Sequence, residues 1–196
     1  MIIGWIGLGN IGCVMASNLI KAGYHLIVHD LEYQAAEKLI SAGAEWAATP
    51  RELAAKADSI ITSLPGPPQV RSVMEGECGV FAGIRSGCTW IDMSTTDAEE
   101  VERLGAIAAE KGVSVLEAPL TGGVTLARAG GITMLVGGDK DVFEAQLPML
   151  RKIGGIVPYT VDEGRFATSQ ELKSEYVEAG RRSDPTEMSN LASFVE

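Results

Sequence analysis

Four glycines within ten residues constrain this chain more than any other feature. The segment GWIGLGNIGC, residues 4–13, has glycine at positions 4, 7, 9 and 12 between two apolar runs. Glycine in a strand or helix costs conformational entropy and lowers helix propensity. A chain that concentrates glycine where a strand gives way to a helix therefore needs backbone freedom or close approach at that point.

The last three of these glycines form a phosphate-binding pattern. The stretch G-x-G-x-x-G consists of Gly7, Leu8, Gly9, Asn10, Ile11 and Gly12. An apolar run precedes it and a helical pattern follows it, which is the context that gives the pattern meaning. Gly7 then permits a tight turn, Gly9 lets a pyrophosphate approach the backbone, and Gly12 lets the helix pack closely on the sheet. The N–H groups and dipole of the helix N-terminus attract the phosphates.

An acidic residue ends the next expected strand. Asp30 closes the run HLIVHD, 18 positions after Gly12, close to the spacing of a carboxylate that binds the adenosine ribose. A carboxylate accepts hydrogen bonds from the 2′-hydroxyl and repels a 2′-phosphate, so the sequence favours NAD over NADP. The alternative is an aspartate that only caps a turn. We expect structural roles for His25 and His29, because no other reactive candidate lies near them in the sequence.

Short apolar runs alternate with helical patterns along the first 160 residues. We expect strands over residues 1–7, 25–30, 59–65, 89–95, 113–119, 132–138 and 155–160. We expect helices over 11–22, 33–42, 50–58, 67–74, 97–111 and 139–152. Capping boxes begin two of them, with Thr49 and Glu52 in one and Thr96 and Glu99 in the other. Continuous apolar strands alternating with helices predict a Rossmann-type, doubly wound α/β fold with a mainly parallel sheet.

Composition narrows the function and the compartment. Hydrophobic residues make up 46% and charged residues 21%, as in globular domains, and the net charge of −10 disfavours nucleic-acid or membrane partners. The three cysteines, Cys13, Cys78 and Cys88, form no C-x-x-C pair, so we expect packed, reduced thiols and no metal site. The start MIIGWIGLG lacks a basic region and no apolar run reaches membrane-spanning length, so we expect a cytoplasmic protein.

Two further strand ends carry small hydroxyl residues and glycine. These are IDMSTT, residues 91–96, and APLTGG, residues 118–123. Ligands of open α/β sheets bind at the carboxyl ends of strands. Thr121, Gly122 and Gly123 could therefore bring hydroxyl and N–H donors onto a carboxylate. Taken singly, either stretch could equally be an ordinary turn.

Several ordered motifs together carry a family resemblance. They are GLGNIGCVMASNLIKAG, SLP at 63–65, IDMST, LEAPLTGG and MLVGGD. Over residues 1 to about 157 the chain resembles the β-hydroxyacid dehydrogenases, with their 6-phosphogluconate dehydrogenase-like NAD-binding domain. Within that family it resembles 3-hydroxyisobutyrate dehydrogenases and, more closely, 2-hydroxy-3-oxopropionate reductases. The resemblance implies an NAD(P)-dependent oxidoreductase that takes a hydride from the alcohol carbon of a small hydroxyacid, or returns one to the corresponding semialdehyde.

The resemblance also implies roles for individual residues. The 7–12 loop would hold the pyrophosphate and Asp30 the ribose. Leu64 and Pro65 would lie along the cofactor, and Thr95 near the nicotinamide side. The substrate carboxylate would be bound by Thr121, Gly122 and Gly123.

The family pattern breaks after residue 157. The catalytic lysine of the family, which exchanges a proton with the substrate oxygen, follows a glycine-rich motif. The matching stretch here is VDEGRFATSQELKSE, and Gln170 occupies the lysine position. A glutamine amide exchanges no proton at neutral pH. Lys173 lies on nearly the same helix face one turn later, although a solvent-exposed lysine is the plainer interpretation.

We therefore expect two regions. Residues 1–160 form an NAD(P)-binding domain, and residues 161–196 form a divergent polar tail with one helix over 169–179. The family's all-helical second domain, which closes the cleft and builds the dimer, is not recognisable, so we expect a truncated gene product or a shortened paralogue. Three functions stay open: a hydroxyacid oxidoreductase, a dinucleotide-binding fragment or pseudoenzyme, and a scaffold that uses its uncovered surface to form a homodimer.

Overall fold

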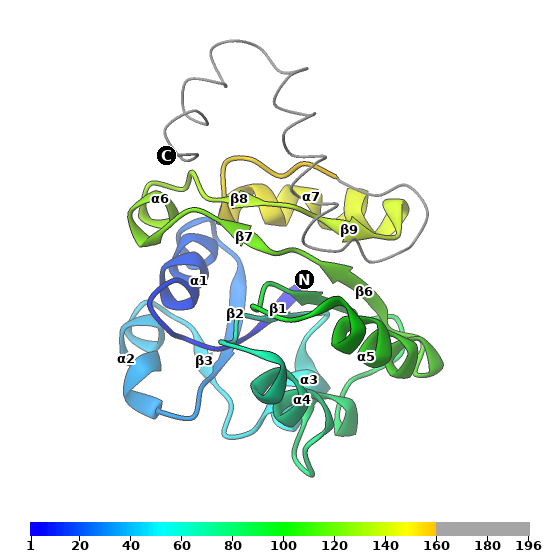
Figure 1. Cartoon of the computed structure of the whole chain (residues 1–196). Helices are drawn as coiled ribbons and strands as arrows, with labels where there is room; N and C mark the ends of the chain where they lie inside the picture. The colour runs from blue at the N-terminus through cyan, green and yellow to red at the C-terminus, as the bar shows by residue number, and fades with distance from the viewer. Residues whose placement is uncertain (160–196) are drawn as a thin grey trace.

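The structure is a computed structural model that describes residues 1–159, in which seven strands form one twisted sheet (Figure 1). The spatial order is β3-β2-β1-β4-β5-β6-β9. The strands are β1 (Ile2–Ile6), β2 (His25–His29), β3 (Glu45–Trp46), β4 (Ser59–Thr62), β5 (Thr89–Asp92), β6 (Ser114–Glu117) and β9 (Gly137–Gly138). All neighbours pair in parallel except β6 and β9. This order is that of a doubly wound Rossmann sheet.

Helices cover both faces of the sheet, as the continuous apolar strands predict (Figure 1). One face packs against α1 (Gly12–Lys21), α2 (Tyr33–Ser41) and α7 (Lys140–Ile153). The other packs against α3 (Pro50–Lys56), α4 (Pro67–Glu75) and α5 (Ala98–Glu110). Within β1 the side chains alternate, with Ile3 and Trp5 in the first core cluster and Ile6 in the second. Gly4 lies where α3 crosses closely, since a Cβ there would come 2.2 Å from Leu53 Cδ2.

One expected helix start is confirmed and the other is wrong. Thr49 Oγ1 accepts a hydrogen bond from the Glu52 N–H at 3.1 Å, which caps α3. At α5 the cap is Asp97, whose side chain accepts from the Glu100 N–H at 2.9 Å, instead of the expected Thr96. A carboxylate is a strong acceptor at the positive end of a helix dipole. The shift by one residue places Glu100 in the third helical position.

The region after β6 differs from the expected pattern of one strand per apolar run. The run at 132–138 divides into β8 (Thr133–Met134), which pairs with β7 (Leu120–Thr121), and β9, which pairs with β6. The backbone at Gly138 has φ +132°, a conformation that favours glycine. The expected strand at 155–160 contributes only isolated bridges at Ile156 and Tyr159. Which strand each segment pairs with depends on tertiary contacts, and hydrophobic periodicity does not encode that choice.

Further short elements were not anticipated from sequence. They are β3, β7, the helix α6 (Val124–Arg128) and a 3₁₀ turn at Val80–Ala82. The expected tail over 161–196 and its helix, together with Gln170 and Lys173, lie outside the described residues.

The described residues, 1–159, also bear on membrane crossing and metal binding. Within that range no helix combines the length and the apolarity required to cross a bilayer. The same residues contain no group of three or more histidine, cysteine or acidic side chains placed to hold a metal ion. All three cysteines are free, with Cys88 buried and Cys13 half-buried. Cys78 is exposed, so the expectation that all three thiols are packed is wrong for this residue.

Candidate functional site

A cleft of about 740 Å³ crosses the carboxyl ends of the parallel strands. Its walls come from the segments that follow β1, β2, β4, β5 and β6. Most of the residues singled out from sequence line it: Gly7, Gly9, Asn10, Ile11, Gly12, Asp30, Leu64, Pro65, Thr95 and Gly122. The fold thus brings together side chains that are spread over more than half of the chain.

Three of the residues singled out lie outside that lining. Leu8 has a buried side chain that packs in the core. Thr121 belongs to β7, opposite Thr133, and Gly123 precedes the first turn of α6. Arg128 lines a separate cleft, together with residues of α1 and α2. It therefore does not face the main cleft.

Each glycine of the 7–12 loop is needed for a different physical reason. Gly7 has φ +96°, and a Cβ there would come 2.3 Å from the Ser63 carbonyl oxygen. A Cβ at Gly12 would come 2.2 Å from the Gly7 carbonyl oxygen. A Cβ at Gly9 meets no described atom within 4 Å, since it points into open space at the cleft. Gly7 and Gly12 therefore shape the turn, and Gly9 leaves open space above it.

The loop is tied to β2 through Asp30. One carboxylate oxygen of Asp30, Oδ2, accepts a hydrogen bond from the Leu8 N–H at 2.6 Å, and Oδ1 accepts one from the Glu32 N–H at 3.1 Å. A carboxylate has about four lone-pair positions, so both oxygens keep capacity for a further donor. Among the described residues, no side chain caps the N-terminus of α1, which leaves its first turn open to an anion.

The two histidines have structural contacts. The ring of His29 is buried, and its Nδ1 lies 2.9 Å from the Ala47 carbonyl oxygen, although the residue also lines the cleft. On the exposed side of β2, His25 Nε2 lies 2.8 Å from Glu45 Oε1. These contacts join β2 to the β3 segment, in line with the expected structural roles.

A buried aspartate organises the loops after β4 and β5. Asp92 is only 1% exposed, and its Oδ1 accepts hydrogen bonds from Thr62 Oγ1 at 2.7 Å and from the Ser94 N–H at 3.1 Å. Ser94 Oγ in turn accepts from the Leu64 N–H at 3.0 Å. Burial raises the pKa of Asp92 above its ordinary value, and the hydrogen bonds from Ser94 and Thr62 oppose that rise. This network fixes the backbone that carries Leu64 and Thr95.

Next to Asp92 lies Glu117, which sequence reasoning missed. The two residues are direct neighbours across the β5–β6 pair, and Glu117 lines the cleft while only 9% exposed. Burial, and then the negative charges of Asp92 and Glu102, raise the pKa of Glu117 to about 7. An acidic residue inside the apolar run VSVLEAP was the signal that could have identified it.

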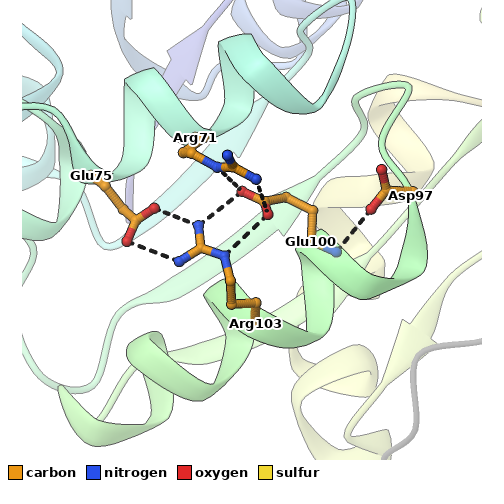
Figure 2. Close-up of polar contacts among 5 residues, drawn as sticks. All are labelled: Arg71, Glu75, Asp97, Glu100 and Arg103. Carbon is orange, nitrogen blue, oxygen red and sulfur yellow. Dashed lines mark hydrogen bonds and ion pairs between the residues drawn. The ribbon is translucent and has the colours of Figure 1, made fainter.

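The α4 wall of the cleft is held by an ion-pair cluster (Figure 2). Arg71 of α4 donates two parallel hydrogen bonds to Glu100 of α5, from Nε to Oε1 at 2.9 Å and from Nη2 to Oε2 at 2.8 Å. Arg103 also donates to both Glu100 oxygens and reaches back to Glu75 of α4. The cluster therefore joins the helix that lines the cleft to its neighbour at two points.

Burial and charge act together in this cluster. The Glu100 side chain is 5% exposed, whereas those of Arg71 and Arg103 are 59% and 41% exposed. Hydrogen bonds from Arg71 and then Arg103 lower the pKa of Glu100 to about 2. The same pairing raises the pKa of both arginines and lowers the pKa of Glu75. Glu100 is therefore a fully ionised carboxylate at any physiological pH.

Comparison with known proteins gives a family model and close relatives. Residues 2–161 match the model described as "NAD binding domain of 6-phosphogluconate dehydrogenase". The mitochondrial 3-hydroxyisobutyrate dehydrogenase of Mus musculus is 39% identical over 178 residues, which cover 87% of this chain and 50% of that protein. The chain spans about half the length of the curated relatives it matches. The resemblance to β-hydroxyacid dehydrogenases is thereby confirmed.

Solved structures agree with the fold. The 3-hydroxyisobutyrate dehydrogenase of Mycobacterium tuberculosis, solved with L-serine, superposes with a TM-score of 0.79 at 28% identity, covering 91% of this chain and 59% of that one. Psf3, solved in complex with NADP⁺ and 2-OPP, gives a TM-score of 0.79 at 27% identity, covering 91% and 62%. The expected Rossmann-type architecture is confirmed by this likeness.

Proposed function

We propose that this chain, which belongs to the family of the NAD binding domain of 6-phosphogluconate dehydrogenase, binds a nicotinamide dinucleotide in the main cleft. One observation carries the proposal: the glycine loop and Asp30 converge on a single cleft across the carboxyl ends of the strands. Ligands of open α/β sheets bind at this place, where the strand order reverses. A volume of about 740 Å³ lies within the range of small-molecule sites.

The residues present fit such a cofactor. The open space at Gly9 and the uncapped first turn of α1 suit a pyrophosphate, and Asp30 suits a ribose diol. Thr96 lines the same cleft, and its hydroxyl interacts with the buried Asp92 carboxylate. When bound, the nicotinamide would accept or supply a hydride at a carbon of the substrate.

The preference for NAD over NADP is part of this proposal. A 2′-phosphate on the adenosine ribose would bring a second anion against the Asp30 carboxylate, and the like charges repel. Psf3, a structural relative, is solved with NADP⁺, so this fold also accommodates the phosphorylated form.

For the reaction, we propose hydride transfer on a small hydroxyacid. Support comes from the mouse relative, a 3-hydroxyisobutyrate dehydrogenase. Gly122, at φ +121°, brings backbone to the end of the cleft, where the carboxylate of the substrate would lie. Thr121 and Gly123 flank it in the chain but do not themselves line the cleft. The proton-transfer residue is not assigned, because Gln170 and Lys173 lie outside the described residues.

A second candidate function is cofactor binding without turnover. Within residues 1–159, the cleft lining includes no lysine, and its ionisable side chains are His29, Asp30 and Glu117. Thermal stabilisation by NAD(H) with no oxidation of 3-hydroxyisobutyrate would select this candidate. Turnover of that substrate would select the oxidoreductase. A cytoplasmic location and a homodimer both stay predictions.

The test is calorimetric titration of the full chain with NAD⁺, NADH, NADP⁺ and NADPH. We expect NAD(H) to bind more tightly than NADP(H), and Asp30→Asn to weaken NAD⁺ binding about tenfold through loss of the charged acceptor. Glu32→Gln is the matched control, since it removes the same charge two residues away without lining the cleft. Gly9→Val should abolish binding while leaving the thermal midpoint unchanged, because its side chain enters open space. A folded chain that binds none of the four dinucleotides would refute the proposal.

A further inference from the structure

The two ends of the main cleft carry different acidic side chains. Asp30 and Leu31 line one end, after β2, and Glu117, Pro119 and Gly122 line the other, after β6. The strand order places β1, β4 and β5 between these ends. A long ligand in the cleft therefore presents one end to Asp30 and the other to Glu117.

The position of the nicotinamide follows from this arrangement, on the premise of the proposed function. With the ribose at Asp30 and the pyrophosphate on the 7–12 loop, the nicotinamide half lies over the ends of β5 and β6. The nicotinamide ring carries one positive charge when oxidised and none when reduced. Both forms carry the same pyrophosphate, so comparison of the two isolates the charge of the ring.

We propose that Glu117 makes the relative affinity for oxidised and reduced cofactor depend on pH. The ionised carboxylate attracts the cationic ring of the oxidised form and gives no such benefit to the neutral ring of the reduced form. The protonated carboxyl has no net charge and discriminates much less. Glu117 is thus a specificity-determining residue for the redox state of the cofactor.

The surroundings of Glu117 suit this role. Its side chain is 9% exposed, and among the described residues it has no hydrogen-bond or ion-pair partner that would neutralise it. Water is largely excluded from it, which strengthens the interaction of its charge with a nearby ring. A carboxylate with only a structural task would be expected to have donors around it, as Asp92 has.

Burial, together with the charges around it, places the pKa of Glu117 near neutrality. Asp92 faces it from β5, and Glu102 acts on it from α5. From β9 the neighbours are glycines, and the α7 side chains buried against the sheet are uncharged: Phe143, Gln146, Met149, Leu150 and Ile153. Burial and the two negative charges raise the pKa of Glu117 to about 7. Its charge therefore changes between about pH 6 and pH 8.

The experiment measures Kd for NAD⁺ and for NADH on the full chain, between about pH 6 and pH 8 at constant ionic strength. We expect the ratio of Kd for NADH to Kd for NAD⁺ to rise about tenfold over this range. In Glu117→Gln, which keeps the shape but has no ionisable group, the ratio should stay constant within about twofold.

A pair of variants on α5 provides an independent measure that leaves the cleft untouched. Glu102→Gln removes a negative charge that acts on Glu117, so the midpoint of the pH profile should move to lower pH. Glu110→Gln removes the same charge from an exposed position on the same helix and should leave the midpoint unchanged. These two variants decide the question if Glu117→Gln does not fold.

Three results would overturn the proposal. They are a ratio independent of pH in the unaltered chain, an identical profile in Glu117→Gln, and equal midpoints in the two α5 variants. A folded chain that binds neither form at any pH would instead refute the proposed function, and this inference with it.

Discussion

Two buried glutamates in different regions of the molecule behave in opposite ways. Glu100, between α4 and α5, and Glu117, at the cleft end of β6, are 5% and 9% exposed. Yet the pKa of Glu100 falls to about 2, whereas that of Glu117 rises to about 7. Two arginines donate to Glu100, whereas the negative charges of Asp92 and Glu102 act on Glu117. Burial alone therefore does not determine the protonation state of a carboxyl group, because the charge and hydrogen bonding of its neighbours decide the direction of the pKa shift.

The difference separates a structural role from a functional one. A carboxylate saturated by two guanidinium groups fixes helix positions but has little capacity to respond to a ligand or to pH. A carboxyl group that is buried without a partner lowers stability when it ionises, and its charge is available to the cleft. Perturbed, unpaired groups of this kind collect at functional sites.

The largest expected effect comes from removing the charge of Glu100. Glu100→Gln keeps the volume but weakens both arginine contacts and leaves two guanidinium groups near a neutral side chain, so we expect a loss of about 2 kcal/mol. For a chain of this size, this corresponds to a fall in the thermal midpoint of roughly 4–8 °C at neutral pH. Differential scanning calorimetry measures it, and Glu99→Gln, on the exposed side of the same helical turn, is the control.

The pH dependence of this loss has a definite sign. The pKa of Glu100 is lowered from 4.5 to about 2, so its stabilisation is complete above about pH 5 and disappears as the pH falls from 4.5 towards 2. The difference between Glu100→Gln and the unaltered chain should shrink over that window. A difference that stays constant down to pH 3 would show that charge pairing is not its source.

A smaller effect of opposite sign is expected at Glu117. Its pKa is raised from 4.5 to about 7, so the folded chain retains a proton that the unfolded chain loses, and stability declines as the pH rises through this interval. Glu117→Gln removes the decline. With a discount for contact with water in the cleft, we expect a gain of about 1.5 kcal/mol, or roughly 3–6 °C, at pH 8 and none near pH 5. An equal shift at both pH values would point to packing instead of ionisation.

The smallest effect is expected at an exposed ion pair, which tests whether pairing without burial contributes to stability. Lys56 Nζ lies 3.7 Å from Glu45 Oε2, and the two side chains are 61% and 49% exposed. We expect Lys56→Gln to change the thermal midpoint by less than about 2 °C, since exposed pairs are screened by water and lose side-chain entropy. A fall as large as that of Glu100→Gln would contradict the view that burial gives the Glu100 cluster its strength.

Sequence was sufficient for the parts of the fold that depend on local pattern. The glycine loop, the buried strands and the Thr49 cap each combine apolar periodicity with specific residue types. The division of residues 132–138 between two sheets was not foreseeable, because it depends on which strand lies opposite. Asp97 and Thr96 were both possible caps for α5, and Asp97 is the one observed. A difference of one residue lies within the ordinary uncertainty of helix ends.

The candidate site shows the same division. Gly7, Gly9 and Asp30 belong to a motif whose spacing has a physical reason, so sequence placed them on one cleft. Glu117 was missed because a single acidic residue in an apolar strand does not reveal its neighbours. The bond between Arg71 and Glu100 spans 29 residues and joins two helices, and no local pattern predicts such a contact.

The hydrogen bond from the Leu8 N–H to Asp30 limits attempts to engineer this protein for another coenzyme. Replacement of Asp30 by a small or basic residue, the obvious way to admit a phosphorylated ribose, would also release the backbone of the glycine turn. Conversion of the coenzyme preference would then require another hydrogen-bond acceptor for the Leu8 N–H. Without it, the variant would tolerate the phosphorylated ribose but bind both coenzymes more weakly.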